Sequence, residues 1–340
     1  MTFIGASLAS ITEVDRVVLR PRATAQHNAP AFVDVSFLPS RGMSLHQARA
    51  RLSNGTTIDI VNGSLSFAGA ILLPFANRIR GRLEPDGKTI ETSVLGRRVS
   101  LPANWRGHRP AAEQCAMHGL MFDVPVRVTE VRPDFVVAMF DAGNFNGHWP
   151  SRTLLHLVAT LSSTCLEFSV TVQNTGRDPL PIGIGWHPYF TIPSGERSQA
   201  RLHIPAARRA CVSNYDDVFP TGALVDVAGT PYDFRAPEGA ALGTQYFDDM
   251  FVDLEKTSAG HTQIELQDPA SGYHMRLTAL SRHVSAVQLY APPDGAFAVI
   301  EPQFNWADPF SDVWPAGVNT GMVVVRPDAD ITWAVRWELL

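Results

Sequence analysis

Apolar and polar residues alternate with a period of two along most of this chain. Every second residue is apolar in residues 166–173 and again in residues 331–339, with one exception at Ala334. Because successive side chains of a strand point to opposite faces, each run predicts a strand with one face against a core. Residues 264–277 alternate on both sides of Asp268-Pro269 and Ser271-Gly272, whose turn chemistry predicts a hairpin.

Similar runs recur along the chain, and no helical pattern longer than about ten residues carries proper caps. These runs read AFVDVSF, KTIETSVLG, VRVTEV, FVVAMF, RLHIP, AVQLYA and AFAVIE. So many short strands, with Gly and Pro mostly between them, predict an all-β fold, either a large antiparallel β-sandwich or a barrel. Neither an internal repeat nor a linker divides the sequence, so we predict one domain over residues 1–340.

Composition places the chain among globular proteins. Its 340 residues are 45% hydrophobic and 18% charged, which is enough to bury a large core. The formal net charge is -5, from 28 Lys and Arg against 33 Asp and Glu. The basic residues are scattered, with no block longer than a pair such as Arg97-Arg98. A nucleic-acid partner is therefore not expected.

The cysteines and the N-terminal residues bear on the compartment. Cys115, Cys165 and Cys211 are widely spaced and form no C-x-x-C pair, which favours a reducing compartment over a disulfide scaffold. Residues 1–18 lack the positively charged start of a signal peptide. No stretch approaches the ~18 consecutive apolar residues of a membrane span. We expect a cytoplasmic protein without a membrane partner, as a monomer or a homodimer.

Residues 181–190, PIGIGWHPYF, form the most informative stretch of the chain. Gly183 and Gly185 permit backbone conformations and close approaches that other residues cannot adopt. Pro188 favours an extended conformation at His187. The imidazole is the side chain best suited to donating a proton near neutral pH. A rigid strand end in which His187 is simply hydrogen-bonded is an equally open interpretation.

The aromatic residues around this stretch are candidates for a pocket wall. Trp186, Tyr189 and Phe190 offer flat apolar surface of the kind that stacks on a sugar ring. Further tryptophans fall in loop-like stretches, and the sequence does not distinguish among them: Trp105, Trp149, Trp306 and Trp314.

Two polar islands interrupt the apolar pattern upstream of this stretch. Asn77 and Arg78 follow the apolar run AILLPF. An arginine just beyond a buried strand can clamp hydroxyls or a carboxylate, or it can simply close a surface turn. His118 precedes Gly119, which permits a tight bend that exposes the imidazole. A structural role is the more common one for such a histidine.

Two further islands carry carboxylates. Asp248 and Asp249 are adjacent in an extended segment, so at most one can face a given cleft, and we expect the other to be solvated. Glu301 ends the apolar run AFAVI, where a carboxylate is costly unless it is paired with an arginine or functional. Burial at this position raises the pKa of a carboxyl group and makes it a better proton acceptor near neutrality.

The order of these islands resembles the aldose 1-epimerase (galactose mutarotase) family. From about residue 30 to the C-terminus, the sequence carries Asn-Arg, His-Gly, Gly-x-x-His-Pro-Tyr-Phe, Asp-x-x-Phe and Glu-x-Gln in that order. The His-Pro-Tyr-Phe element is the most specific part. The resemblance implies a large antiparallel β-sandwich enzyme that interconverts the α and β anomers of a sugar, with no metal and no cofactor.

The resemblance also implies roles for individual residues. Glu301 is the expected base that takes the proton of the anomeric hydroxyl, and His187 is the expected acid that protonates the ring oxygen. Asp248 is preferred to Asp249 because the aspartate of the family lies three residues before a phenylalanine, here Phe251. The side chains expected to bind sugar hydroxyls, the last two as second contacts, are Arg78, His118, Asp248, Asn77 and Gln303.

Two departures from the family pattern leave the identity of the sugar open. After Glu301-Pro302-Gln303 the family commonly continues with a Pro-Asp-Ala-x-Asn-like loop, whereas this chain reads FNWADPFSDVWPAGVNTGM. A Pro-Gly pair often precedes the last strand of the family, whereas residues 326–330 read RPDAD here.

Three other interpretations stay open at this point. A non-catalytic sugar-binding module would share the sandwich and the aromatic lining. A hexose phosphate would need a cluster of cations, for which Arg78 and Arg80 are available, although we prefer a neutral sugar. A zinc or iron site lacks an H-E-x-x-H motif or tight spacing here, but four side chains could supply ligands: His118, His187, Asp248 and Glu301.

Overall fold

The computed structural model describes residues 15–22 and 29–340, and most of these residues belong to a β-strand or to a turn between strands. Residues 1–14, the greater part of the stretch in which no signal peptide is predicted, lie outside the described residues. The named helical elements are three short 3-10 turns, η2 (Pro39–Arg41), η3 (Phe145–Gly147) and η4 (Arg197–Gln199). Among the described residues, no helix has the length and apolar character needed to cross a membrane.

A nine-stranded antiparallel sheet forms one layer. Its order is β12 (Arg127–Arg132), β13 (Phe135–Gly143), β14 (Thr153–Leu161), β15 (Cys165–Asn174), β29 (Asp330–Leu339), β25 (Tyr273–Ala279), β24 (Thr262–Asp268), β19 (Arg201–His203) and β22 (Ala240–Ala241). The two clearest alternating runs are therefore neighbours in the middle of this sheet, as β15 and β29, with Phe168 opposite Val335. The predicted hairpin is β24–β25.

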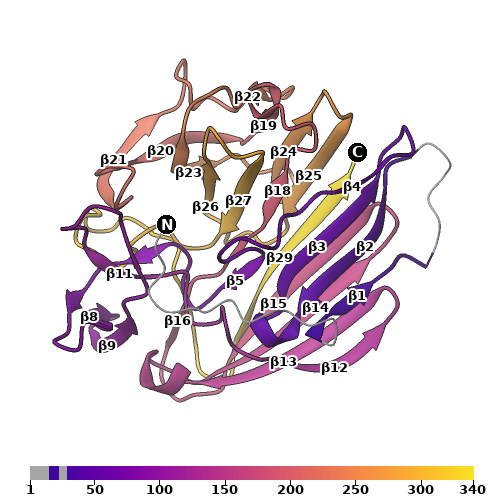
Figure 1. The fold of residues 1–340 in the computed structure, drawn as a ribbon. Helices are drawn as coiled ribbons and strands as arrows, with labels where there is room; N and C mark the ends of the chain where they lie inside the picture. The colour runs from indigo at the N-terminus through magenta and orange to yellow at the C-terminus, as the bar shows by residue number, and fades with distance from the viewer. Residues whose placement is uncertain (1–14, 23–28) are drawn as a thin grey trace.

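Two smaller sheets face this layer. A six-stranded sheet has the order β18 (Tyr189–Thr191), β27 (Phe297–Gln303), β26 (Ala286–Ala291), β23 (Phe247–Leu254), β20 (Ala206–Val212) and β21 (Pro220–Asp226). A four-stranded sheet has the order β1 (Val17–Leu19), β2 (Ala31–Leu38), β3 (Ser44–Arg51) and β4 (Thr57–Asp59). Figure 1 shows β2 and β3 running across β14 and β15. An isolated bridge between Val61 and Phe190 joins the segment after β4 to β18.

Four further sheets are short. One joins β10 (Trp105–Arg106), β11 (Gln114–Met117) and β6 (Arg78–Ile79), and another joins β7 (Arg82–Leu83), β8 (Thr89–Val94) and β9 (Arg97–Pro102). The two-stranded ones are β5 (Ala70–Leu72) with β17 (Gly185–His187), and β16 (Leu180–Ile182) with β28 (Val323–Val325). Pairing of β6 with β11 places Arg78 opposite Met117, the residue before His118, and pairing of β5 with β17 places His187 opposite Ala70.

The core between the layers is rich in aromatic residues. Phe168 of β15 contacts Phe37 of β2, with ring centroids 5.5 Å apart. Trp337 of β29 contacts Phe32 of β2 and Phe190 of β18, in both cases with centroids 5.1 Å apart. The nine-stranded sheet therefore packs against both facing sheets. Rings of this size contribute much of the apolar area buried on folding.

This architecture confirms the predicted large antiparallel β-sandwich rather than the barrel. Neither large sheet closes on itself among the described residues, and the paired strands named above run antiparallel. The seven further runs that predicted strands all contain one: β2, β8, β12, β13, β19, β26 and β27.

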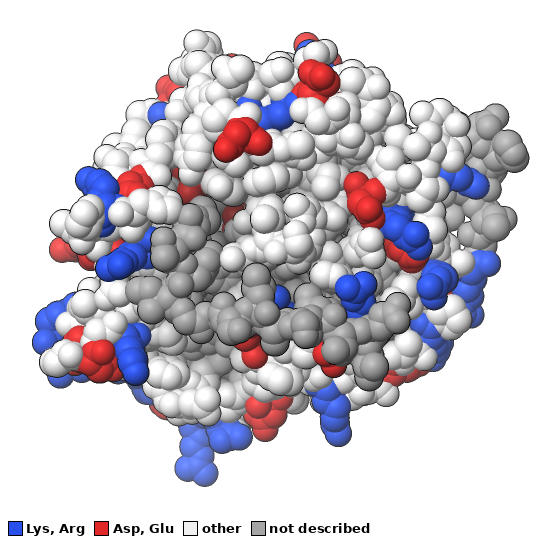
Figure 2. All heavy atoms as spheres, in the orientation of Figure 1, with Lys and Arg blue, Asp and Glu red and all other residues white. Residues whose placement is uncertain are grey.

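The surface charges and the thiols add two constraints. On the face shown in Figure 2, basic and acidic side chains lie interspersed between large uncharged areas. All three cysteines are free thiols, and Cys115 is fully buried. Burial raises the pKa of Cys115 to about 12 and that of Cys165 to about 11. Neither thiol is therefore a nucleophile at neutral pH, since the thiolate is the reactive form.

Phe168→Ala tests the contribution of the aromatic core. Phe168 is 1% exposed and contacts Trp333 of its own sheet and Phe37 of the facing sheet, so its removal leaves a cavity that the neighbours fill only in part. We expect the free energy of unfolding in urea to fall by about 3–5 kcal/mol. The matched control is Ser169→Ala, on the outer face of the same strand, with a change within about 0.5 kcal/mol. Equal losses in the two variants would contradict this sandwich.

Candidate active site

A pocket lies on the six-stranded sheet where β23, β26 and β27 are neighbours. Asp248 of β23 is opposite Tyr290 of β26, and Gln288 of β26 is opposite Glu301 of β27. Because side chains two residues apart or directly opposite share a face, these four point into the same space. These four side chains line one pocket together with residues of other segments.

The segment PIGIGWHPYF supplies another wall of this pocket. His187 and Tyr189 line the pocket, whereas Trp186 and Phe190 point into the core and are fully buried. Trp186 donates a hydrogen bond from Nε1 to the carbonyl of Gly69. Alternation along the strand separates the two sets. The expectation that Trp186 and Phe190 offer their rings to a ligand is therefore wrong, and Tyr189 is the aromatic residue of this stretch that faces the pocket.

Two left-handed turns complete the pocket. Asn77, His118 and Gly119 have φ angles of 61°, 61° and 77°. The backbone N–H of His118 donates to the carbonyl of Asn77 at 2.8 Å, beside the pairing of β6 with β11. A Cβ atom at Gly119 would lie 2.2 Å from the carbonyl oxygen of Leu73. Glycine is therefore required there both for its φ angle and for the close approach of the two chains.

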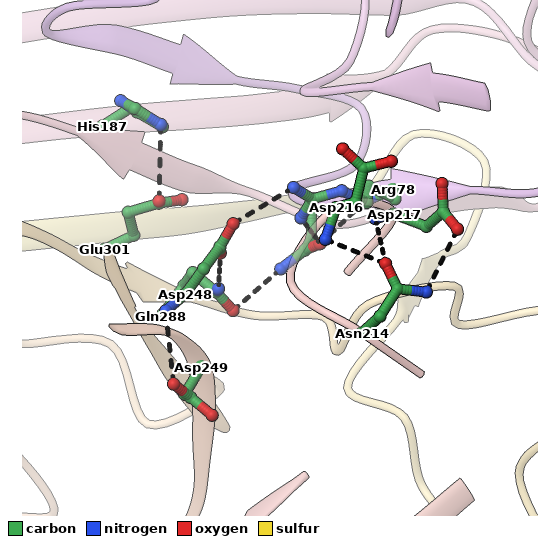
Figure 3. Close-up of polar contacts among 10 residues, drawn as sticks. Arg78, His187, Asn214, Asp216, Asp217, Asp248, Asp249, Gln288 and Glu301 are labelled. Carbon is green, nitrogen blue, oxygen red and sulfur yellow. Dashed lines mark hydrogen bonds and ion pairs between the residues drawn. The ribbon is translucent and has the colours of Figure 1, made fainter. Parts of the chain in front are cut away.

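Glu301 and His187 form a close pair in the pocket (Figure 3). Nε2 of His187 lies 3.4 Å from Oε1 of Glu301, and the two side chains are 6% and 2% exposed. Oε2 of Glu301 has no hydrogen-bond partner among the described residues. A buried polar atom without a partner is costly, so this oxygen is available to a ligand that brings its own donor.

Burial opposes charge on both members of this pair. Desolvation raises the pKa of Glu301 well above its usual value; the charge of Asp248 adds to the rise and that of Arg78 opposes it. Desolvation also lowers the pKa of His187 to about 3. His118, whose ring centroid is 4.8 Å from that of His187, has a pKa lowered mainly by its own burial. At any pH between the pKa of His187 and that of Glu301, the two side chains together hold one proton.

Arg78 is the centre of a second polar network beside the pair. Its Nη2 lies 3.3 Å from Oδ2 of Asp248, and its guanidinium lies over the ring of Trp105, 4.6 Å from the centroid. Gln288 donates to Oδ1 of Asp248 at 2.6 Å and accepts a hydrogen bond from Nδ2 of Asn77 at 3.0 Å. Figure 3 shows the contacts of Asp248 with Arg78 and with Gln288. Donors and acceptors are thus held in fixed positions at one end of the pocket, as recognition of a polyhydroxylated ligand requires.

Asp249 lies on the opposite face of β23, but the expectation that it is solvated is wrong. It is fully buried, with Oδ1 3.0 Å from Nη1 of Arg209, and the hydroxyl of Tyr215 donates to its carboxylate at 3.0 Å. Desolvation raises the pKa of Asp249 to about 6. The covering residues come from β20 and from the loop after it, which the local pattern around Asp249 does not reveal.

The pocket lining contains most of the residues that the sequence singled out: Glu301, His187, Arg78, His118, Asp248 and Asn77. Gln303 is fully buried but lies outside this lining. Gly185 covers it, since a Cβ atom there would lie 3.2 Å from Cβ of Gln303. The four loop tryptophans also lie outside the lining, and all are buried.

Other lining residues were missed by the sequence analysis. Gln288 and Tyr290 belong to the run AVQLYA, where a glutamine inside an otherwise apolar run is the signal that could have indicated a site. Phe67 precedes β5 in a stretch without periodicity, and its ring centroid lies 5.0 Å from that of His118. Only the three-dimensional arrangement identifies Phe67 as part of the pocket.

The described residues also bear on the metal and phosphate interpretations. No group of three or more His, Cys, Asp or Glu side chains within residues 15–22 and 29–340 is arranged to hold a metal ion. Arg78 is the one Lys or Arg in the described pocket lining. Arg80 pairs instead with Asp308 at 3.1 Å and lies over Phe219. A phosphate in the pocket would therefore meet a single cation that Asp248 already neutralises.

Comparison with known proteins adds a family and a fold. The sequence matches the family model described as aldose 1-epimerase over residues 45–335. A similar solved structure is an aldose epimerase homologue from C. elegans, with 18% identity, a TM-score of 0.75, and 96% of this chain and 98% of that chain covered. A galactose mutarotase-like protein from Clostridium acetobutylicum has 16% identity, coverage of 96% and 99%, and a TM-score of 0.71. Galactose 1-epimerase from Lactobacillus acidophilus NCFM has 15% identity, coverage of 96% and 98%, and a TM-score of 0.63.

The protonation state of His187 tests the buried environment of the pair. Because burial lowers the pKa of His187 to about 3, we expect its ring to remain neutral at about pH 5 in an NMR titration of the folded chain. His187→Asn assigns the resonance. The urea-unfolded chain is the control, in which the same imidazole titrates near pH 6.5, its usual pKa. A midpoint near pH 6.5 in the folded chain would show a solvated site and contradict this description.

Proposed function

This chain belongs to the aldose 1-epimerase family, and we propose that it interconverts the α and β anomers of a neutral aldose. The observation that carries the proposal is the 3.4 Å approach of Nε2 of His187 to Oε1 of Glu301 inside the pocket. A general base and a general acid side by side are what ring opening of a cyclic hemiacetal requires.

Ring opening moves two protons, one from and one to the two oxygens that are bonded to the anomeric carbon C1. The anomeric hydroxyl O1 loses its proton, the bond between C1 and the ring oxygen O5 breaks, and O5 gains a proton. Because O1 and O5 are bonded to the same carbon, the base and the acid must be close neighbours. The freed aldehyde rotates about the C1–C2 bond, and closure on its other face returns both protons to give the other anomer. The reaction is neither a redox change nor a group transfer.

Glu301 and His187 can perform both transfers without taking a proton from solvent. In the ion-pair form, the carboxylate of Glu301 accepts the proton of O1 and the imidazolium of His187 donates to O5. Opening leaves Glu301 protonated and His187 neutral, which is the form that burial favours. Closure reverses both transfers and restores the ion pair. The buried site therefore stabilises the neutral pair, which accompanies the open-chain intermediate. Polar groups of the bound sugar stabilise the ion pair, which accompanies the closed ring.

The second network would hold the sugar in register with this pair. Arg78 and Asn77 offer donors and Asp248 offers acceptors to the sugar hydroxyls, and the ring centroid of His118 lies 4.8 Å from that of His187. Gln288 takes the place that the sequence analysis gave to Gln303, because it lines the pocket and contacts Asp248. Fixed polar groups of this kind keep O1 and O5 aligned with the acid and the base.

Catalysis on a neutral aldose is favoured over two alternatives, a hexose phosphate as substrate and sugar binding without catalysis. A hexose phosphate requires several cations, and the one arginine of the described lining is paired with Asp248. A sugar-binding module without catalysis has no use for a buried carboxyl group beside an imidazole, since burying both groups is costly for folding. Calorimetry that detects sugar binding in the absence of any anomerisation would favour the binding module.

Glu301→Gln tests the proposed base. The variant keeps the size of the side chain and one acceptor oxygen but cannot accept a proton, so we expect kcat to fall by about 10²–10⁴-fold, or about 3–5 kcal/mol of barrier. Sugar affinity measured by calorimetry is expected to change by less than about threefold. Glu338→Gln, on β29 and outside the pocket lining, is the control for the substitution itself. A polarimetric rate near that of the wild type would remove Glu301 from the mechanism.

The pH dependence distinguishes a coupled pair from two independent groups. Independent groups at their usual pKa values would be active mainly between about pH 4.3 and 6.5, with the carboxyl ionised and the imidazole protonated. The coupled pair keeps its single proton from about pH 3, where His187 takes up a second one, up to the raised pKa of Glu301.

We therefore expect kcat/KM of the folded chain to stay level as the pH falls through 4.5, and to decline on the alkaline side as the pair loses its proton. Polarimetry over pH, corrected for the buffer reaction, gives the profile, and circular dichroism at each pH verifies that the chain is folded. An acid limb centred near pH 4.5 while the chain is folded would be the wrong result for a coupled pair.

A further inference from the structure

Asn305 is a fully buried amide four residues beyond Glu301, outside the pocket lining. Its Oδ1 accepts a hydrogen bond from the backbone N–H of Ala76 at 2.9 Å, and its Nδ2 donates to the carbonyl of the same residue, also at 2.9 Å. Nδ2 also donates to the carbonyl of Trp306 at 2.9 Å. One side chain therefore satisfies both backbone groups of the residue that precedes Asn77.

Gly183 provides the space in which this amide lies. A Cβ atom at Gly183 would be 1.9 Å from Oδ1 of Asn305 and 2.5 Å from its Cγ. Gly183 has no positive φ, so its conformation does not require glycine. The absence of a side chain at Gly183 is thus explained by the close approach of Asn305 alone.

The same segment holds the far end of the turn. The backbone N–H of Asp308 donates to the carbonyl of Arg78 at 2.7 Å, and Oδ1 of Asp308 accepts from the backbone N–H of Arg80 at 3.0 Å. Asn77 lies between these two anchors with a φ of 61°. Asn305 and Asp308 therefore form hydrogen bonds on both sides of the turn that presents Asn77 and Arg78. Both residues belong to the segment that follows β27, the strand that carries Glu301.

We infer that Asn305 is a positioning residue, which sets the distance between the sugar-binding turn at residues 77–78 and the base Glu301. This inference rests on the proposed function, because it assigns the two residues of the turn to sugar binding. Without the amide, the N–H and C=O of Ala76 are buried and unpaired, so the turn shifts to satisfy them. Arg78 then loses its alignment with Asp248, whose Oδ2 is 3.3 Å away. Sugar binding weakens, while Glu301 and His187 remain in place on their own strands.

Asn305→Ala is the direct test, with D-glucose and D-galactose as substrates. We expect KM to rise about tenfold, the effect of losing one hydrogen bond to a charged group, while kcat changes by less than about threefold. Asn174→Ala is the matched control. Asn174 is also fully buried and donates to the carbonyls of Asp178 and Val325, but it lies outside the pocket lining. We expect this control to lose stability with KM unchanged.

A double variant keeps the test decisive if Asn305→Ala alone does not fold. Gly183→Ala alone clashes with Asn305 and lowers the melting temperature. In Gly183→Ala/Asn305→Ala the new methyl group occupies space that the amide vacated, so the melting temperature recovers while KM stays about tenfold above that of the wild type. A double variant with wild-type KM, or an equal rise of KM in Asn174→Ala, would overturn the positioning role.

Binding without turnover separates this inference from the proposed function. Calorimetry with the same two sugars is expected to show about tenfold weaker binding by Asn305→Ala than by Asn174→Ala. If the wild type binds sugar, the two variants show this difference in affinity, and the wild type does not interconvert anomers, then the proposed function fails and the positioning role holds. If the wild type interconverts anomers and the two variants bind sugar equally, the positioning role fails and the proposed function holds.

Discussion

Burial of a carboxyl group beside an imidazole is the interaction on which this site depends. Water would stabilise the charged forms of Glu301 and His187, and its exclusion shifts the pKa of each toward the neutral form. Two neutral neighbours that share one proton suit a reaction in which one proton leaves O1 while another reaches O5, the two oxygens bonded to the anomeric carbon. Either group alone, or both in solvent, would lack this balance.

The β-sandwich supplies the burial and the alignment of this pair. Glu301 is on β27, which pairs directly with β18, and His187 ends β17 only two residues before β18 begins. The pair is therefore fixed by a short connection and by strand register rather than by a flexible loop. Groups from more distant elements then adjust the site, since the charge of Arg78 opposes the upward shift in the pKa of Glu301 and the charge of Asp248 adds to it.

Local pattern predicted the strands of this fold because burial on one face imposes a period of two, as the neighbouring strands β15 and β29 show. The same rule located the carboxylate at the end of a buried strand and distinguished the faces of Asp248 and Asp249. It could not show that Arg209 and Tyr215 cover Asp249, that Gly185 covers Gln303, or that Gln288 shares a face with Glu301. Those contacts depend on strand order and on chain segments far apart in sequence.

NMR exchange spectroscopy on aldoses labelled with ¹³C at C1 tests the central claim most directly, because it measures α to β conversion without a coupled assay. With catalytic amounts of the wild-type chain, we expect exchange cross-peaks between the two anomers of at least one neutral aldose. Their build-up should be proportional to protein concentration and well above the buffer rate. Exchange no faster than in buffer for every sugar of a broad panel, with the chain demonstrably folded, would contradict it.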